Sequence, residues 1–137
     1  MKIITQLCFE GQGDEAIELY KEAFGFTVKS LFHYGDAVKL GWEKPNDSFN
    51  GLVYHSELVR DGTELRVTDL AGAGQAELTR RISVNVQFET EEEVINAFHT
   101  LAKDGEIIRD LEKPPYMVIM GEVKDRFGVH WALMCDF

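Results

Sequence analysis

The same order of expected elements, a strand, a helix and then three strands, occurs twice along this chain of 137 residues. Phe9-Glu10 before the first expected helix matches Phe88-Glu89 before the second. The apolar positions that match between the two helices are Ala16, Ile17, Tyr20 and Ala23 in the first and Val94, Ile95, Phe98 and Leu101 in the second. Their spacing of three and four is that of one helix face. The sequence therefore predicts an internal repeat of a βαβββ unit.

The first half ends its expected helix at Gly25 and contains one strong hairpin signal, Asp61-Gly62. We expect strands at residues 3–9, 26–32, 52–60 and 63–69, a helix at 14–24 with an acidic first turn, and a candidate strand at 37–42. His33 is expected in a loop before Tyr34-Gly35.

The second half opens on a strand, residues 82–88, in which apolar and polar residues alternate. Thr90 is expected to cap the second helix, with Glu93 completing a capping box, and Asp104-Gly105 to end it. His99 on this helix should face solvent. Further strands are expected at 106–111, 116–124 and 129–137. The predicted domain is a single α+β domain, with a first module at 1–70, a linker at 71–79 and a second module at 80–137.

Composition is that of one folded domain with a strongly acidic surface. The chain has 24 acidic and 14 basic residues, a formal charge of −10, which disfavours nucleic acid and membrane surfaces as partners. No run of eighteen apolar residues and no signal-like N-terminal segment occurs. Cys8 and Cys135 are expected to be free thiols. These features lead us to expect a cytoplasmic protein.

Several motifs resemble PhnB-like proteins of the vicinal-oxygen-chelate superfamily, which includes glyoxalase, bleomycin-resistance proteins and dioxygenases. They are Phe9-Glu10-Gly11, residues 15–25, His55-Ser56-Glu57-Leu58, Glu92-Glu93-Val94 and the closing residues 123–131. Two positions depart from the residues usual in this family: Leu19 stands where a Phe is more usual, and His130 stands where a small residue is common. The resemblance implies two βαβββ modules that form a curved mixed sheet around a cavity, and a homodimer.

PhnB-like proteins often have a demethylubiquinone methyltransferase label, which these residues do not support. A methyltransferase normally has a glycine-rich turn from strand to helix within a parallel sheet. The only glycine cluster expected here is Gly72 and Gly74, in the expected linker.

The resemblance also allows a comparison with the metalloenzymes of the superfamily, which hold a divalent metal on corresponding strands of the two modules. Their ligand positions fall here at Ile4 or Thr5 (with Gln6 adjacent), at Glu57, near Arg81 and at Ala132. Only Glu57 is a competent ligand, whereas a catalytic metal has about three protein ligands. We therefore expect no metal site and no cofactor. A divalent metal at a shifted site of His55, Glu57 and His130 remains the alternative.

Polar residues opposite the apolar strand faces indicate where a ligand would bind. Ser83, Asn85 and Gln87 alternate with apolar residues in the second half, as Gln6 and Cys8 do in the first. The candidate ligand-binding residues are Gln6, His55, Glu57, Ser83, Asn85 and His130. No catalytic residue is identified. The leading hypothesis is a protein that binds a small polar or aromatic molecule, as drug-sequestering members of the superfamily do. The alternative is a metal-dependent lyase, isomerase or dioxygenase with an altered ligand set.

Overall fold

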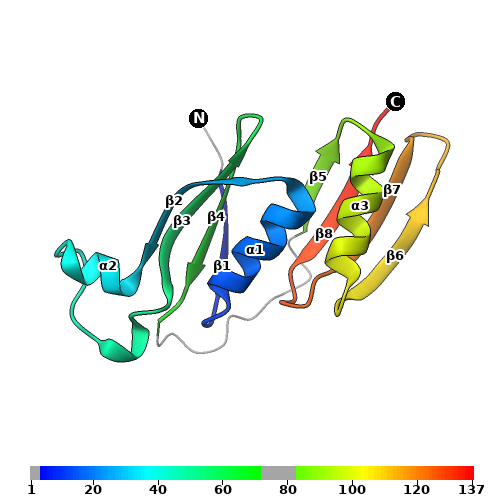
Figure 1. The fold of residues 1–137 in the computed structure, drawn as a ribbon. Coiled ribbons are helices and arrows are strands. Elements are labelled where there is room, and N and C mark those ends of the chain that lie inside the picture. The colour runs from blue at the N-terminus through cyan, green and yellow to red at the C-terminus, as the bar shows by residue number, and fades with distance from the viewer. Residues whose placement is uncertain (1–3, 72–82) are drawn as a thin grey trace. The chain divides into compact units, whose positions relative to one another are not determined.

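A computed structural model describes residues 4–71 and 83–137, which form eight strands and three α-helices (Figure 1). In the first half, the elements are β1 (Thr5–Phe9), α1 (Gly13–Phe24), β2 (Thr27–His33), α2 (Tyr34–Lys39), a 3₁₀ turn η1 (Asp47–Phe49), β3 (Val53–Arg60) and β4 (Thr63–Asp69). In the second half, they are β5 (Val84–Phe88), α3 (Glu91–Ala102), β6 (Glu106–Glu112), β7 (Ile119–Lys124) and β8 (His130–Cys135).

The two halves have the same topology, which bears out the predicted repeat and the α+β class. One four-stranded sheet has the order β1-β4-β3-β2 and the other the order β5-β8-β7-β6. In each, the first strand pairs in parallel and the other two pairings are antiparallel. The expected single curved sheet is thus present as two mixed sheets, each with two edge strands. The chain divides into two compact units, and residues Glu22–Phe24 are grouped with the second.

The first unit buries one face of its sheet toward α1. Phe9 of β1 lies with its ring centroid 6.4 Å from that of Tyr20 on the helix. Leu65 and Val67, two residues apart on β4, lie on the same side of the sheet and are buried. Leu58 of β3, which pairs with Leu65, is buried as well. This alternation leaves the opposite side of the strands to polar residues.

Two helix ends, the C-terminus of α1 and the N-terminus of α3, follow the sequence expectations, whereas α3 ends at Ala102, slightly before the expected Asp104-Gly105. Gly25 adopts a left-handed conformation with φ of 67°, and its amide donates to the carbonyl of Lys21 at 2.9 Å. At the start of α3, the Thr90 hydroxyl accepts a hydrogen bond from the Glu93 amide at 3.2 Å. His99 on α3 is exposed, as predicted.

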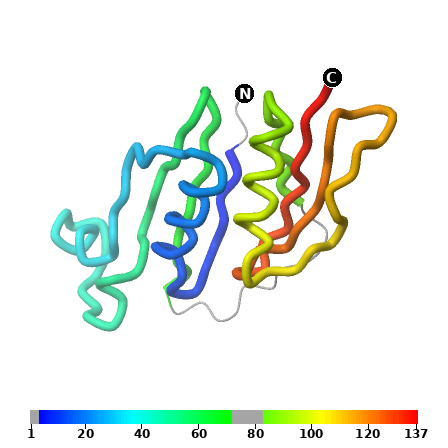
Figure 2. The backbone as a smooth tube through the Cα atoms, turned by 45° about the vertical axis from the view of Figure 1, so that its right-hand side comes forward, coloured from blue at the N-terminus to red at the C-terminus, as the bar shows by residue number. Residues whose placement is uncertain are grey.

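The second unit packs α3 closely on β7 and β8, and Figure 2 shows the helix running along its own sheet. Gly121 of β7 makes this approach possible, because a Cβ atom there would lie 2.9 Å from the Phe98 ring. Trp131 and Leu133 of β8 are buried on the same side. Cys135 is a buried free thiol and Cys8 a half-buried one.

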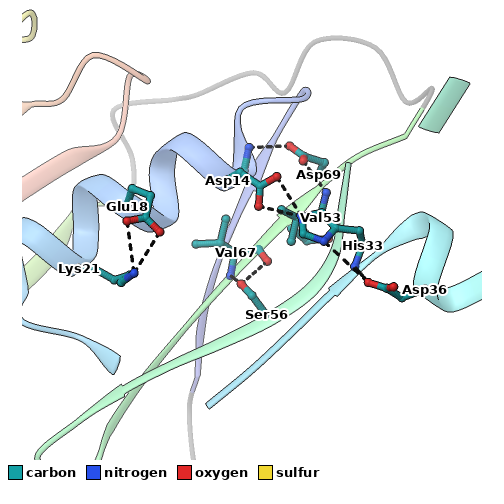
Figure 3. A network of polar contacts seen from close by, with 11 residues as sticks. Asp14, Glu18, Lys21, His33, Asp36, Val53, Ser56, Val67 and Asp69 are labelled. Atoms are coloured by element: carbon teal, nitrogen blue, oxygen red, sulfur yellow. Dashed lines mark hydrogen bonds and ion pairs between the residues drawn. The ribbon is translucent and has the colours of Figure 1, made fainter. Parts of the chain in front are cut away.

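One segment differs from its expectation. The candidate strand at 37–42 is wrong, because Tyr34–Lys39 forms helix α2. His33, expected in a loop, is the last residue of β2 and caps this helix: its amide donates to the Asp36 carboxylate at 2.9 Å. Its ring Nε2 lies 2.8 and 2.9 Å from the two carboxylate oxygens of Asp14 on α1 (Figure 3). The local bond from the His33 amide to Asp36 favours a helix over extension of the strand.

No helix among the described residues has the length and apolar content needed to span a membrane.

Candidate functional site

A row of polar residues crosses all four strands of the first sheet, on the side away from Phe9, Leu65 and Val67. Ser30 of β2 pairs with Glu57 of β3, Glu57 pairs with Arg66 of β4, and Arg66 pairs with Gln6 of β1. Paired residues project to the same side of a sheet. We call this side the polar face of the first sheet.

Glu57 is the centre of this row. Its Oε2 accepts a hydrogen bond from the Ser30 hydroxyl at 3.0 Å, while its Oε1 lies 3.5 Å from both His55 Nε2 and Arg66 Nη2. The Ser30 hydrogen bond is the largest influence that holds the pKa of the Glu57 carboxyl below its ordinary value, with smaller contributions from His55 and Lys29. Desolvation and the charge of Glu64 act in the opposite direction. Glu57 is therefore an ionised acceptor at neutral pH.

Arg66 is held by two carboxylates. Its Nε lies 2.9 Å from Glu64 Oε1, and its Nη2 forms the longer contact with Glu57. The Glu64 side chain is only 8% exposed, so this ion pair is shielded from water on one side. The guanidinium is thus fixed in the middle of the polar face and largely neutralised.

Aromatic side chains lie beside the polar row. Phe32 of β2 pairs with His55, so it shares the polar face. The Trp42 ring meets Phe32 edge-on with centroids 5.2 Å apart, and it lies 6.4 Å from the Tyr54 ring at an interplanar angle of 29°. Trp42 is 54% exposed, which is high for so large an apolar side chain. We call Phe32, Trp42 and Tyr54 the aromatic group.

The second sheet has an equivalent row on the side away from α3. Arg109 of β6 pairs with Glu122 of β7, Glu122 pairs with Ala132 of β8, and Ala132 pairs with Asn85 of β5. Position by position, Glu122 is the counterpart of Glu57, and Ala132 is the counterpart of Arg66. His130 Nε2 lies 3.2 Å from Glu122 Oε2, so this sheet also has a His–Glu pair.

The candidate residues from the sequence therefore fall into two groups. Gln6, His55 and Glu57 lie together on the polar face of the first sheet. In the second unit, Asn85 and His130 lie on β5 and β8, and Ser83 is exposed immediately before β5. Arg81, and most of the expected linker at 71–79, fall outside the described residues.

Sequence reasoning missed Ser30, Arg66 and Glu122, because finding them requires the pairing register between strands. For Arg66 a signal was present. The two-residue turn Asp61-Gly62 pairs Arg60 with Thr63, and counting three residues outward from that pair places Glu57 opposite Arg66. No comparable turn links β2 to β3, whose pairing is interrupted by two register shifts.

A glycine-rich turn from strand to helix is present after all, at Gly11 and Gly13 between β1 and α1. This corrects the expectation that the only glycine cluster is at 72 and 74. Such a turn often binds a phosphate through its free amides. Here the Gly11 and Gly13 amides donate to Asp69 Oδ1 at 2.8 and 3.0 Å. The Val53 amide donates to Asp69 Oδ2 at 2.8 Å (Figure 3). The buried Asp69 carboxylate therefore occupies the anion position.

The closing motif, residues 123–131, has a similar internal role. Asp125 is 2% exposed, and its Oδ1 accepts hydrogen bonds from the Phe127 and Val129 amides at 2.9 and 3.0 Å. Its Oδ2 accepts a hydrogen bond from Trp131 Nε1 at 2.8 Å. The motif thus shapes the β7–β8 turn.

Metal-binding side chains occur in pairs rather than in larger groups within residues 4–71 and 83–137. Over these ranges, no three His, Cys, Asp or Glu side chains are placed to hold one ion. Each unit by itself contributes one His–Glu pair.

This repeated pair of mixed sheets is the glyoxalase/bleomycin-resistance fold. A glyoxalase/bleomycin resistance protein/dioxygenase domain from Frankia matches it with a TM-score of 0.70 at 10% identity, over 100% of this chain and 91% of that one. At that identity the likeness concerns the fold alone.

The family is defined by closer matches. Residues 1–134 match the model of the 3-demethylubiquinone-9 3-methyltransferase family, and the chain belongs to this PhnB-like family. It is similar to a putative 3-demethylubiquinone-9 3-methyltransferase, PhnB protein, from Bacillus cereus, with 31% identity and a TM-score of 0.81 over 98% of this chain and 99% of that one. A Pseudomonas aeruginosa protein is 26% identical, with a TM-score of 0.87 over 99% and 98% of the two chains. No curated protein matches the chain.

Proposed function

We propose that this protein binds a small polar or aromatic molecule on the polar faces of its sheets, without a glyoxalase-type metal. The cross-strand row Ser30–Glu57–Arg66–Gln6 is the observation on which the proposal rests. This half-buried to exposed face has an ionised carboxylate, a guanidinium and an amide next to aromatic rings. Polar groups that converge beside apolar surface are typical of small-molecule sites.

Methyl transfer, which the family description names, has little support in the described residues. The one strand-to-helix glycine turn, at Gly11 and Gly13, has its amides engaged by Asp69. Asp69 also accepts the Val53 amide, so displacing its carboxylate would leave a buried charge without its partners. A methyl donor would need a different binding surface.

A second candidate function, a metal-dependent lyase, isomerase or dioxygenase, is favoured by the two His–Glu pairs. His55 Nε2 lies 3.5 Å from Glu57 Oε1, and His130 Nε2 lies 3.2 Å from Glu122 Oε2. Imidazole and carboxylate suit several divalent metals. Each pair supplies two ligands, one fewer than the three that catalytic metals usually have.

Native mass spectrometry of the purified protein tests ligand binding directly. We expect a small-molecule adduct on the wild type, which is reduced in Glu57→Gln and retained in Glu92→Gln, where the same change is made at an exposed residue of α3. A broad ligand screen by thermal shift supplements it. If no adduct forms and no compound raises the melting temperature, the binding proposal is wrong.

Calorimetric titration with Zn²⁺, Ni²⁺ and Mn²⁺ distinguishes the two functions. We expect no tight site of one ion per chain in either the wild type or Glu57→Gln. A tight site that is lost in Glu57→Gln and retained in Glu92→Gln would favour the metalloenzyme instead.

The proposal includes a cytoplasmic location, which is supported by the free thiols of Cys8 and Cys135. Fractionation of cells that express the protein at its natural level checks this location.

A further inference from the structure

We propose that the polar face of the first sheet selects an aromatic cation: a planar ring bearing one protonated amine, with the ring against the aromatic group and the amine at Glu57. This inference rests on the proposed binding function and names the chemical class of its ligand.

The ring would contact the aromatic group. Phe32 lies two residues along β2 from Ser30 and on the same side of the sheet, so its Cα is about 6.6 Å from that of Ser30 along the strand. Trp42 covers Phe32 edge-on and still has 54% of its surface exposed. An exposed indole beside two more rings offers apolar contact, and its π-face attracts cations.

The amine would bind the carboxylate of Glu57. Its Oε2 is engaged by Ser30, but both ion pairs of Oε1 are 3.5 Å long, beyond the usual length of a charge-assisted hydrogen bond. Oε1 therefore has capacity for a short bond to a ligand N–H. The low pKa of Glu57 keeps this oxygen negative at neutral pH.

The charge balance favours a cation over an anion. Arg66 is the cation within the row, and it is held between Glu64 at 2.9 Å and Glu57 at 3.5 Å. An anionic ligand would have to compete with both carboxylates, and the positive charge of Lys29 near Glu57 only partly offsets them. The chain's net charge of −10 adds long-range attraction for cations.

Three indole probes that differ in charge test the inference on the full chain: tryptamine (cationic), tryptophol (neutral) and indole-3-acetate (anionic). Binding is followed by two-dimensional ¹H–¹⁵N NMR titration. Trp42 and Trp131 provide an internal comparison, because the Trp131 indole is buried and bonded to Asp125. The two indole signals are assigned with Trp42→Phe. We expect the Trp42 signal to shift and the Trp131 signal to stay in place.

We expect tryptamine to bind about tenfold more tightly than tryptophol, and indole-3-acetate to bind most weakly, because only tryptamine places a positive charge against the Glu57 carboxylate. In Glu57→Gln, the preference for tryptamine over tryptophol should disappear while tryptophol binding persists. Trp42→Ala should weaken binding of all three probes. Glu92→Gln and Tyr116→Ala, at exposed residues of the second unit, should change neither result.

Equal or tighter binding of tryptophol or indole-3-acetate at the Trp42 signal would overturn the cation class and leave the binding proposal in place. If none of the three probes shifts a signal on this face, the inference is wrong. The adduct and ligand-screen experiments then decide separately whether the binding function also fails.

Discussion

Asp125 and Trp131 form a buried pair in which the Asp125 carboxylate accepts a hydrogen bond from the indole N–H at 2.8 Å. The same carboxylate receives two backbone amides of the turn between them. Asp69 has a corresponding role in the first unit, where it receives three backbone amides. Each unit thus has one buried aspartate that holds a loop to its sheet.

Replacing Asp125 with Asn should destabilise the protein by about 2 kcal/mol or more. The amide that replaces Oδ2 would point an N–H at the Trp131 N–H, or leave a turn amide without its acceptor, and hydrogen bonds to charged groups are among the stronger ones. Urea denaturation measures the change. Asp104→Asn makes the same substitution at an exposed residue with φ of 60°, which Asn tolerates, and should change stability by less than about 0.5 kcal/mol.

Gly13→Ala should destabilise the protein by about 1–3 kcal/mol, although alanine is the better helix former. The added Cβ would lie 2.8 Å from Asp69 Oδ2 and 2.8 Å from Val53 Cγ2. Gly51→Ala is the matched control, because no atom lies within 4 Å of its Cβ position. Thermal and urea unfolding compare the two variants. A more stable Gly13→Ala protein would contradict the close packing of Asp69 at the start of α1.

Acid should remove a stabilising contribution of Glu57. Its folded pKa is below the ordinary value of 4.5, so the ionised form is favoured by folding. This contribution is fully present above pH 4.5 and is lost as the pH falls through the folded pKa. Stability curves of wild type and Ser30→Ala should therefore differ above that pH and converge in acid, because Ser30 is the main cause of the shift. Carboxyl NMR titration should show a higher Glu57 pKa in Ser30→Ala. An unchanged pKa would exclude that role for Ser30.

We expect a homodimer in solution, as the resemblance implies. The edge strand β6 exposes Ile107 and Ile108, and an uncovered strand edge with apolar side chains favours pairing. Light scattering should give twice the chain mass of 15.6 kDa at micromolar concentrations. Ile107→Lys should shift the mass toward one chain, whereas Leu40→Lys, at an exposed apolar residue of the first unit, should not. A wild-type mass of one chain throughout would contradict the dimer.

Much of the fold follows from local sequence signals. Alternation placed Asn85 and Gln87 on the polar side of β5. Helical spacing identified Val94, Phe98 and Leu101 as buried residues of α3 but missed Ala97. Gly25 and Thr90 marked helix ends because their preferences act within a few residues. The Asp61-Gly62 turn also fixed the register of β3 and β4, and with it the contact between Glu57 and Arg66.

The remaining features depend on contacts between residues distant in sequence. Ser30 meets Glu57 across 27 positions, through a pairing whose register shifts no local pattern encodes. Asp69 meets Gly13 across 56 positions, which turns an apparent phosphate turn into a structural one. The chain by itself determined which residues could form strands, helices and turns, because those preferences are local. The tertiary structure decided that Ser30 and Gln6 share a face with Glu57 and Arg66, because only pairing between strands distant in sequence brings them together.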